Sequence, residues 1–301
     1  MNIKEYHSIS NWFLVALFLI VTSSCHQKVD WNPPGFEQQP VVNSIIRCGK
    51  PIAIKVSQAI PFSAETTPEV DNAEVVLYVD NEFAEILEYT DEGLYESQLE
   101  AQEEKEYRCE VSIPGYPTAE CSAYIPKHQN ILKFEHINIA GVDEEGLTYP
   151  AIKITFDNEP DKSLFYEVVI TLFEDDNVYQ PWLNSIIDPV LLNEGLPITV
   201  FSNEMIKDSS YTMIINYATG SASNANNAGW VTNLFPLQIE LHTVCYDYYK
   251  FIQQQYQYEL ATGEPILSVG VTSTFNLHSN VENGYGIFTG YSAVKTDTIY
   301  P

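Results

Sequence analysis

The sequence contains few basic residues. Only 14 lysines and arginines stand against 41 aspartates and glutamates, which gives a formal net charge of -27. A surface this acidic repels phosphate, so nucleic acid and anionic lipid headgroups are disfavoured as partners. Calcium or a cationic partner would be tolerated, although a solvated acidic surface explains the charge equally well. We therefore expect no nucleic-acid partner.

Recognisable catalytic and metal-binding motifs are also missing. The chain has no CxxC, HExxH or GxSxG sequence, and its histidines are isolated from one another. Paired carboxylates are so abundant that a glycosidase-like pair cannot be identified from spacing alone. The sequence thus predicts a non-enzymatic protein with no catalytic residue, no metal and no cofactor. A glycan hydrolase is the less favoured alternative.

Cysteine is scarce, with five residues in the whole chain. Cys109 and Cys121 lie six residues either side of Gly115, inside the sequence "PGYP". If this segment is a hairpin, the two sulfur atoms face each other across it and can form a disulfide. Two buried free thiols are the alternative. Cys48 and Cys245 would be the remaining pair.

Only one long apolar run is present, at the N-terminus. The sequence "WFLVALFLIV", from Trp12 to Val21, is too short to cross about 30 Å of hydrocarbon as a helix. It is followed by "TSSC", which is typical of a bacterial lipoprotein signal. We predict a signal peptide over residues 1–24, lipid attachment at Cys25 and a polar spacer over 25–39. An ordinary secretory signal is the alternative.

The rest of the chain has the composition of a β-protein, with 20 tyrosines and 14 phenylalanines. Residues 40–126 contain seven short alternating segments separated by turn residues, which predicts a β-sandwich of immunoglobulin or transthyretin type. Residues 131–301 predict a second β-rich domain. Within it, apolar and aromatic residues at spacings of three and four predict one helix near 245–260. The predicted fold class is mainly β.

The segment "SNVENGYGIFTGYSA" (279–293) contains three closely spaced glycines, as phosphate-binding loops do. The third, Gly290, falls one residue late for the dinucleotide pattern, and both flanks alternate like strands. We therefore predict a terminal β-hairpin that turns at Asn283 and Gly284. Gly286 and Gly290 would allow a twist or the close approach of another backbone.

This segment carries a family resemblance, together with the preceding "CYDYYKFIQQQYQYEL". Both resemble the C-terminal signature of a Bacteroidota lipoprotein family known as domain of unknown function 4249 (DUF4249). "NAEVVLYVDN", "DEGLYES" and "VFSNEMIKDSSYTMII" extend the likeness over essentially the whole mature chain. The sequence departs from the family where "SNE" replaces a common acidic residue. The signature positions are Ser279, Asn280, Gly284, Gly286, Phe288 and Gly290.

The resemblance implies a lipid-anchored outer-membrane protein, in a leaflet that it leaves open, and no established activity. Members resemble proteins encoded near TonB-dependent transporters. We therefore expect a ligand-binding or accessory subunit of such a transporter, with a surface adhesion or structural module as the alternative. The ligand would be a glycan or a peptide. Trp182 and Trp230 are candidate stacking residues, unless each is buried in the core.

Overall fold

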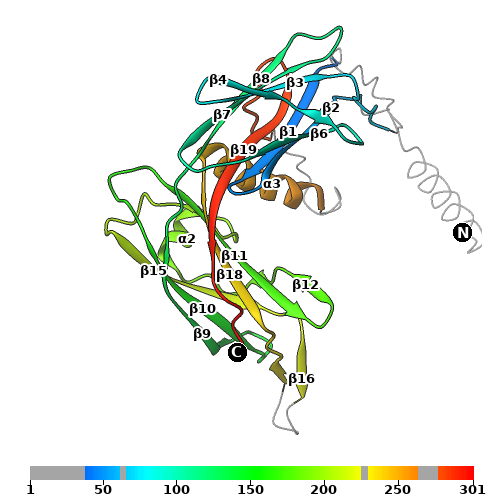
Figure 1. Cartoon of the computed structure of the whole chain (residues 1–301). Coiled ribbons are helices and arrows are strands. Elements are labelled where there is room, and N and C mark those ends of the chain that lie inside the picture. Colours follow the sequence, from blue (N-terminus) through cyan, green and yellow to red (C-terminus); the bar gives the residue numbers. More distant parts are fainter. Residues whose placement is uncertain (1–37, 62–65, 225–229, 264–276) are drawn as a thin grey trace, which may run out of the picture. The chain divides into compact units, whose positions relative to one another are not determined.

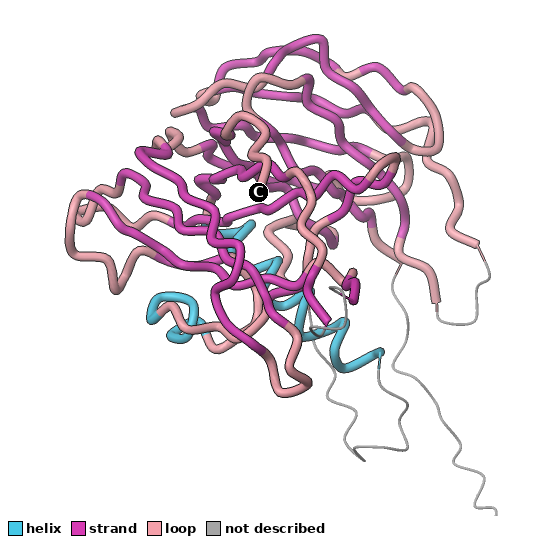
Figure 2. Tube along the Cα trace, turned by 90° about the horizontal axis from the view of Figure 1, so that it is seen from below, coloured by secondary structure: helices cyan, strands magenta, loops and turns pink. Residues whose placement is uncertain are grey.

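The computed structural model describes residues 38–61, 66–224, 230–263 and 277–301 (Figure 1). The predicted signal peptide, the predicted lipidation site Cys25 and nearly all of the predicted spacer lie outside these residues. The part that is described consists mainly of strands, as the sequence predicts (Figure 2). In it, no helix is both long enough and apolar enough to span a bilayer.

The N-terminal third of the described chain is a sandwich of two sheets. Its strands are β1 (Pro40–Arg47), β2 (Pro51–Gln58), β3 (Glu74–Val79), β4 (Glu82–Ile86), β5 (Glu88–Tyr89), β6 (Leu94–Glu100), β7 (Lys105–Ser112) and β8 (Ala119–Ile125). Strands β1, β2, β6 and β5 belong to one sheet, and β4-β3-β7-β8 form the other. Alternate side chains such as Val42, Leu77 and Val111 are fully buried in a shared core. Strict alternation therefore places one face of each sheet in the interior.

The remaining two thirds of the described chain are also built from packed sheets. Its strands are β9 (Ile131–Val142), β10 (Thr148–Asp157), β11 (Phe165–Glu174), β12 (Asn177–Tyr179), β13 (Trp182–Leu183), β14 (Val200–Ser202), β15 (Ser210–Ala218), β16 (Ala222–Asn224), β17 (Trp230–Thr232), β18 (Leu237–Val244) and β19 (Tyr285–Lys295). A four-stranded sheet, β13-β15-β10-β9, packs on β11 and β18. The aromatic rings of Phe156, Tyr166 and Phe201 lie in the core between them.

One sheet runs through both sandwiches, in the order β12-β11-β18-β19-β1-β2-β6-β5 with β14 also on β11. The strand that joins them is β19, which crosses the structure from one sandwich to the other (Figure 1). Its residues from Tyr285 to Tyr291 pair in parallel with β1. Residues 291–295 pair antiparallel with β18. The last strand of the chain thus completes the sheet of the first sandwich.

Two glycines of β19 lie where the backbone of β1 is very close. A Cβ atom at Gly286, whose φ is +112°, would collide with the carbonyl oxygen of Val42. A Cβ atom at Gly290 would lie 2.6 Å from the carbonyl oxygen of Ile46. Only glycine accommodates this approach, which the sequence predicts at both positions.

The predicted terminal hairpin is wrong in its pairing. Residues 277–281 form no strand, and the partners of β19 are β18 and β1. The remainder of the expected partner strand lies outside the described residues. Asn280 explains the difference: its side chain accepts from Phe288 N–H at 2.9 Å and donates to Ser122 C=O at 3.0 Å. This amide fixes the segment between β19 and β8 and satisfies backbone groups of both.

Two helices are present in the described residues. The longer one, α3 (Tyr246–Gly263), confirms the helix predicted near 245–260 and packs through Tyr248 and Tyr249 on the edge of β18 and β14. The shorter one, α2 (Pro189–Glu194), is not predicted, because six residues are too few for a periodic pattern. Asp188 caps it by accepting from Val190 N–H at 3.0 Å.

Candidate functional site

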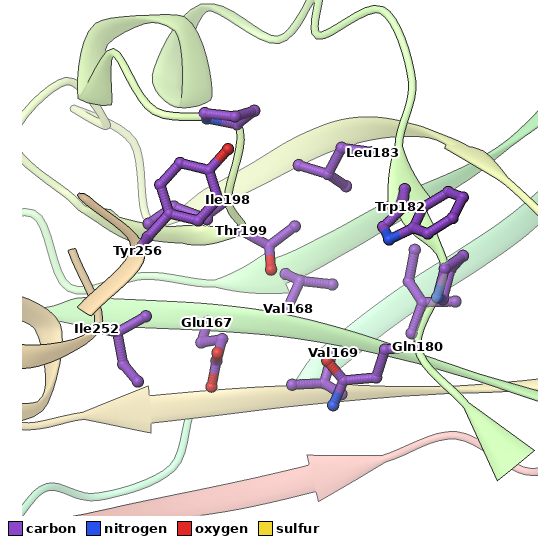
Figure 3. Close-up of a pocket in the computed structure, with 13 residues that line it drawn as sticks. Glu167, Val168, Val169, Gln180, Trp182, Leu183, Ile198, Thr199, Ile252 and Tyr256 are labelled. Atoms are coloured by element: carbon purple, nitrogen blue, oxygen red, sulfur yellow. The ribbon is translucent and has the colours of Figure 1, made fainter. Parts of the chain in front are cut away.

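A pocket of about 440 Å³ lies beside strand β11 and the middle of α3. Strand β11 supplies Glu167–Ile170, and α3 supplies Ile252 and Tyr256. The loops Gln180–Leu183 and Pro197–Thr199 complete the lining. Figure 3 shows the two loops and the helix around an open space along β11. Three segments distant in sequence therefore meet at one strand.

The pocket exists because the edge of the sheet is interrupted there. Strand β14 pairs with β11 only at Phe165–Glu167, and β12 pairs with it only at Leu172–Glu174. Both strands lie on the same edge of β11. If β14 continued in register toward the middle, Pro197 would lie opposite Ile170, and if β12 continued, Pro181 would lie opposite Ile170. Proline has no N–H to donate to a ladder, so neither strand can extend. The sequence thus stops both strands and leaves a gap between them.

Trp182 and Tyr256 stand on opposite sides of the pocket (Figure 3). The side chain of Trp182 is 78% exposed, although its backbone is held to β15 by pairing with Ala218. Trp230 is also exposed, at 62%, but it lies on β17 and does not line this pocket. The alternative that these tryptophans are buried is wrong for both. The structure brings one of the two predicted aromatic residues to a cavity.

One wall of the pocket is connected to a mostly buried polar network. Glu167 Oε2 accepts a hydrogen bond from the Tyr248 hydroxyl at 2.7 Å and lies 3.0 Å from His242 Nδ1. The other ring nitrogen of His242 lies 3.2 Å from Glu240 Oε2. Arg47 then reaches Glu240 at 3.3 Å from the first sandwich. The network fixes the carboxylate of Glu167 at the pocket wall.

Burial keeps the tyrosine hydroxyl groups of this network protonated. It raises the pKa of Tyr248, and the carboxylate of Glu167 raises it further. Burial also raises the pKa of Tyr291, whose ring stacks on His242 with centroids 4.3 Å apart. Both hydroxyls are therefore neutral near pH 7 and can donate hydrogen bonds. Among the lining residues Glu167 is the one carboxylate, and none is a lysine, arginine or histidine.

Neither Glu167 nor His242 can be identified as a site residue from the sequence, in which the histidines are isolated and acids are abundant. Burial marks this region in the structure. In β18 the side chains from Leu241 to Val244 are all buried, although apolar and polar residue types still alternate in the sequence at Leu241 and His242. A strand buried on both faces indicates a helix or a second layer over the sheet. Here the cover is α3, which brings Tyr248 to the carboxylate of Glu167.

Cys109 and Cys121 are direct neighbours across β7 and β8, as the hairpin predicts. The structure nevertheless holds both as buried free thiols, so the expected disulfide is not formed in it. Glu106 C=O accepts from the N–H of Asp80, the residue after β3, so by alternation the backbone of Cys109 points to β8. Cys109 and Cys121 therefore form a hydrogen-bonded antiparallel pair, in which the side chains are farther apart than in a non-hydrogen-bonded pair. Cys48 and Cys245 are also free.

The signature residues serve the joint between the sandwiches and lie away from the pocket. Phe288 is fully buried in the first core, and Gly284, Gly286 and Gly290 lie close to the backbone of β1 or to side chains beside it. Ser279 Oγ lies 3.4 Å from Val281 N in the segment that Asn280 fixes. None of these residues lines the cavity beside β11. The positions that identify the sequence are structural.

Residues 27–297 match the family described as domain of unknown function (DUF4249). A search of curated proteins finds no match. Among solved structures, one described as a membrane-anchored protein from Corynebacterium diphtheriae is similar over 70% of this chain and 55% of its own, with 11% identity and a TM-score of 0.21. The chain thus spans about half the length of that structure. So low a TM-score supports no argument about function.

Proposed function

We propose, from the premise that this chain belongs to the DUF4249 family, that it is a lipid-anchored outer-membrane protein that binds a ligand beside β11. The observation that carries the proposal is the pocket in which an exposed tryptophan faces Tyr256 across a preformed space. A tryptophan ring at the rim of a cavity can stack on a ligand, and ligand sites combine apolar walls with a few polar groups. Gln180, Thr199 and Glu167 supply those groups.

Binding fits the site better than hydrolysis. Glycoside hydrolysis requires two carboxyl groups flanking the bond to be broken, and one carboxylate lines this pocket. The nearby imidazole of His242 is engaged on both nitrogens by Glu167 and Glu240. A group held on both sides is poorly placed to exchange protons with a substrate. We therefore assign the pocket a binding role and no catalytic residue.

The anchor and the partner complete the proposal. The sequence "TSSC" ending at Cys25 supports lipidation, and the polar spacer after it supports a folded body held away from the bilayer. A tethered binding protein of this kind would deliver its ligand to a TonB-dependent transporter. In detergent extracts of native membranes, the protein should co-purify with that transporter. Recovery of the protein alone from crosslinked membranes would remove this part of the proposal.

The binding role is tested with two tryptophan variants of the full-length protein. Calorimetric titration with a panel of neutral oligosaccharides and capped tripeptides should give saturable binding to the wild type by at least one class. Trp182→Ala should weaken that binding about tenfold, because an aromatic stacking contact contributes roughly 0.5–1.5 kcal/mol beyond the apolar area that it buries. Trp230→Ala is the matched control and should leave it unchanged. No binding by any probe, or equal losses in both variants, would overturn the proposed site.

A further inference from the structure

The gap in the edge of β11 leaves backbone groups directed into the pocket. Residues of an antiparallel strand point their N–H and C=O alternately to the two neighbours. Val168 N–H donates to Thr199 C=O at 3.1 Å on the outer side, so the groups of Ile170 also point outward. Within the part of the chain that is described, no hydrogen bond reaches the N–H or C=O of Ile170 on that side. These two groups require a partner.

The free edge is short and bounded at both ends. The last contact from β14 is at Val168, and the first from β12 is at Leu172. At about 3.3 Å per residue, this edge offers room for roughly three residues of an extended chain. Because β14 and β12 are both antiparallel to β11, a segment that continued their direction would pair in the same sense. Longer strands would collide with Thr199 or Gln180.

The charged group beside this edge is the carboxylate of Glu167. A peptide residue opposite Val169 would direct its side chain to the same face as Glu167, at the diagonal distance of about 7–8 Å. A lysine or arginine side chain spans that distance. Both hydrogen bonds to Glu167 end on Oε2, so within the described residues Oε1 has no protein partner and is available to a ligand. The aromatic rings of Tyr256 and Trp182 flank the same space and attract cations.

We propose that the pocket binds a short extended peptide segment with a basic side chain. The backbone of the segment pairs with Ile170, and its ammonium or guanidinium group binds Glu167. The inference rests on the proposed binding function and narrows its ligand class to peptides. A neutral glycan carries no charge that could pair with Glu167. Water alone would satisfy the N–H and C=O of Ile170 but would not select a ligand. The acidic composition of the chain, with 41 acids and 14 bases, favours the same cationic ligand.

The test compares three capped tripeptides on the full-length protein: acetyl-Val-Val-Lys-amide, acetyl-Val-Val-Glu-amide, and the lysine peptide N-methylated at its central residue. The wild type should bind the lysine peptide about tenfold or more tightly than the glutamate peptide, because a like charge beside Glu167 opposes binding. Methylation of the central nitrogen removes a hydrogen-bond donor and should weaken binding about tenfold. Glu167→Gln should bring the lysine and glutamate peptides to within about threefold of each other.

Each outcome is decisive. Equal binding of the lysine and glutamate peptides, or no effect of methylation, would overturn the peptide proposal. Binding of oligosaccharides that depends on Trp182, without binding of peptides, would also overturn it and leave the proposed function intact. Absence of all binding would remove both. If Glu167→Gln lowers the melting temperature so far that it cannot be titrated, the N-methylated peptide decides the question on the wild type.

Discussion

The two sandwiches share one sheet but differ in what lies on its outer face. In the first, β1 alternates strictly, and outward side chains such as Asn43 and Ile45 are exposed to solvent. In the second, α3 lies on the sheet, and β18 is buried on both faces from Leu241 to Val244. An open face can leave its polar groups to water, whereas a covered face must pair them within the protein. The covered half therefore contains the His242 network and the pocket.

The largest expected effect comes from disrupting the pairing of β19 with β1, which joins the two sandwiches. Gly286→Ala places a Cβ atom against the carbonyl oxygen of Val42 at a φ that favours glycine, so β19 must shift away from β1. We expect a loss of about 3 kcal/mol or more of unfolding free energy, measured by urea denaturation. Gly115→Ala is the control, because its φ is also positive but no atom lies within 4 Å of the added Cβ. It should lose only about 1–2 kcal/mol. Equal losses would show that the contact with β1 is unimportant.

The second prediction contrasts a covered contact between histidine and carboxylate with a partly exposed one. His242→Ala removes the group between Glu167 and Glu240 and leaves two largely buried carboxylates with fewer partners. The expected cost is about 2–4 kcal/mol. In the first sandwich, His128 lies 2.7 Å from Glu103, with both side chains partly exposed. His128→Ala should cost less than about 1 kcal/mol because solvent screens the pair. Similar melting temperatures for the two variants would contradict the contrast.

The third and smallest effect is a pH dependence in the second sandwich. Burial lowers the pKa of His136 from its ordinary value of 6.5, although a hydrogen bond with Asn138 partly opposes the shift. The unfolded chain therefore binds a proton at a pH where folded His136 stays neutral. Its contribution to stability is fully present above pH 6.5 and is lost as the pH falls below it.

The measurement for His136 is the unfolding free energy at pH 7.5 and at pH 5.5. The wild type should lose more stability on acidification than His136→Gln, which cannot titrate at this position. Because the ring also bonds the Tyr217 hydroxyl at 2.8 Å, the variant will be less stable at both pH values. The pH-dependent difference is the relevant quantity. An identical pH dependence in both proteins would refute the assignment.

Local patterns in the sequence predict most of the strands. The segments "PVVNSIIR" and "AECSAYI" become β1 and β8, because alternation of apolar and polar residues directly encodes a half-buried strand. The helix α3 follows from its spacing in the same way. The short helix α2 is missed because its six residues depend on the Asp188 cap and on tertiary packing.

The candidate site is less accessible to prediction. Trp182 can be selected as an aromatic residue of interest, but nothing local shows that it faces Tyr256 across a pocket. Glu167 looks like any other acid in a chain that has 41 of them. Its position at the pocket depends on β18, α3 and β11 meeting in space. The prolines at 181 and 197 mark the gap only after the pairing registers are known.

Residues close together in the chain specify the alternating strands, the tyrosine-rich helix, the glycines where β19 approaches β1, and the family to which the chain belongs. Two other features come from contacts between distant segments. They are the completion by β19 of a sheet shared by two sandwiches, and the open edge of β11 beside a carboxylate. Pairing between distant strands sets both features, because the hydrogen bonds of a sheet edge depend on which segments reach it.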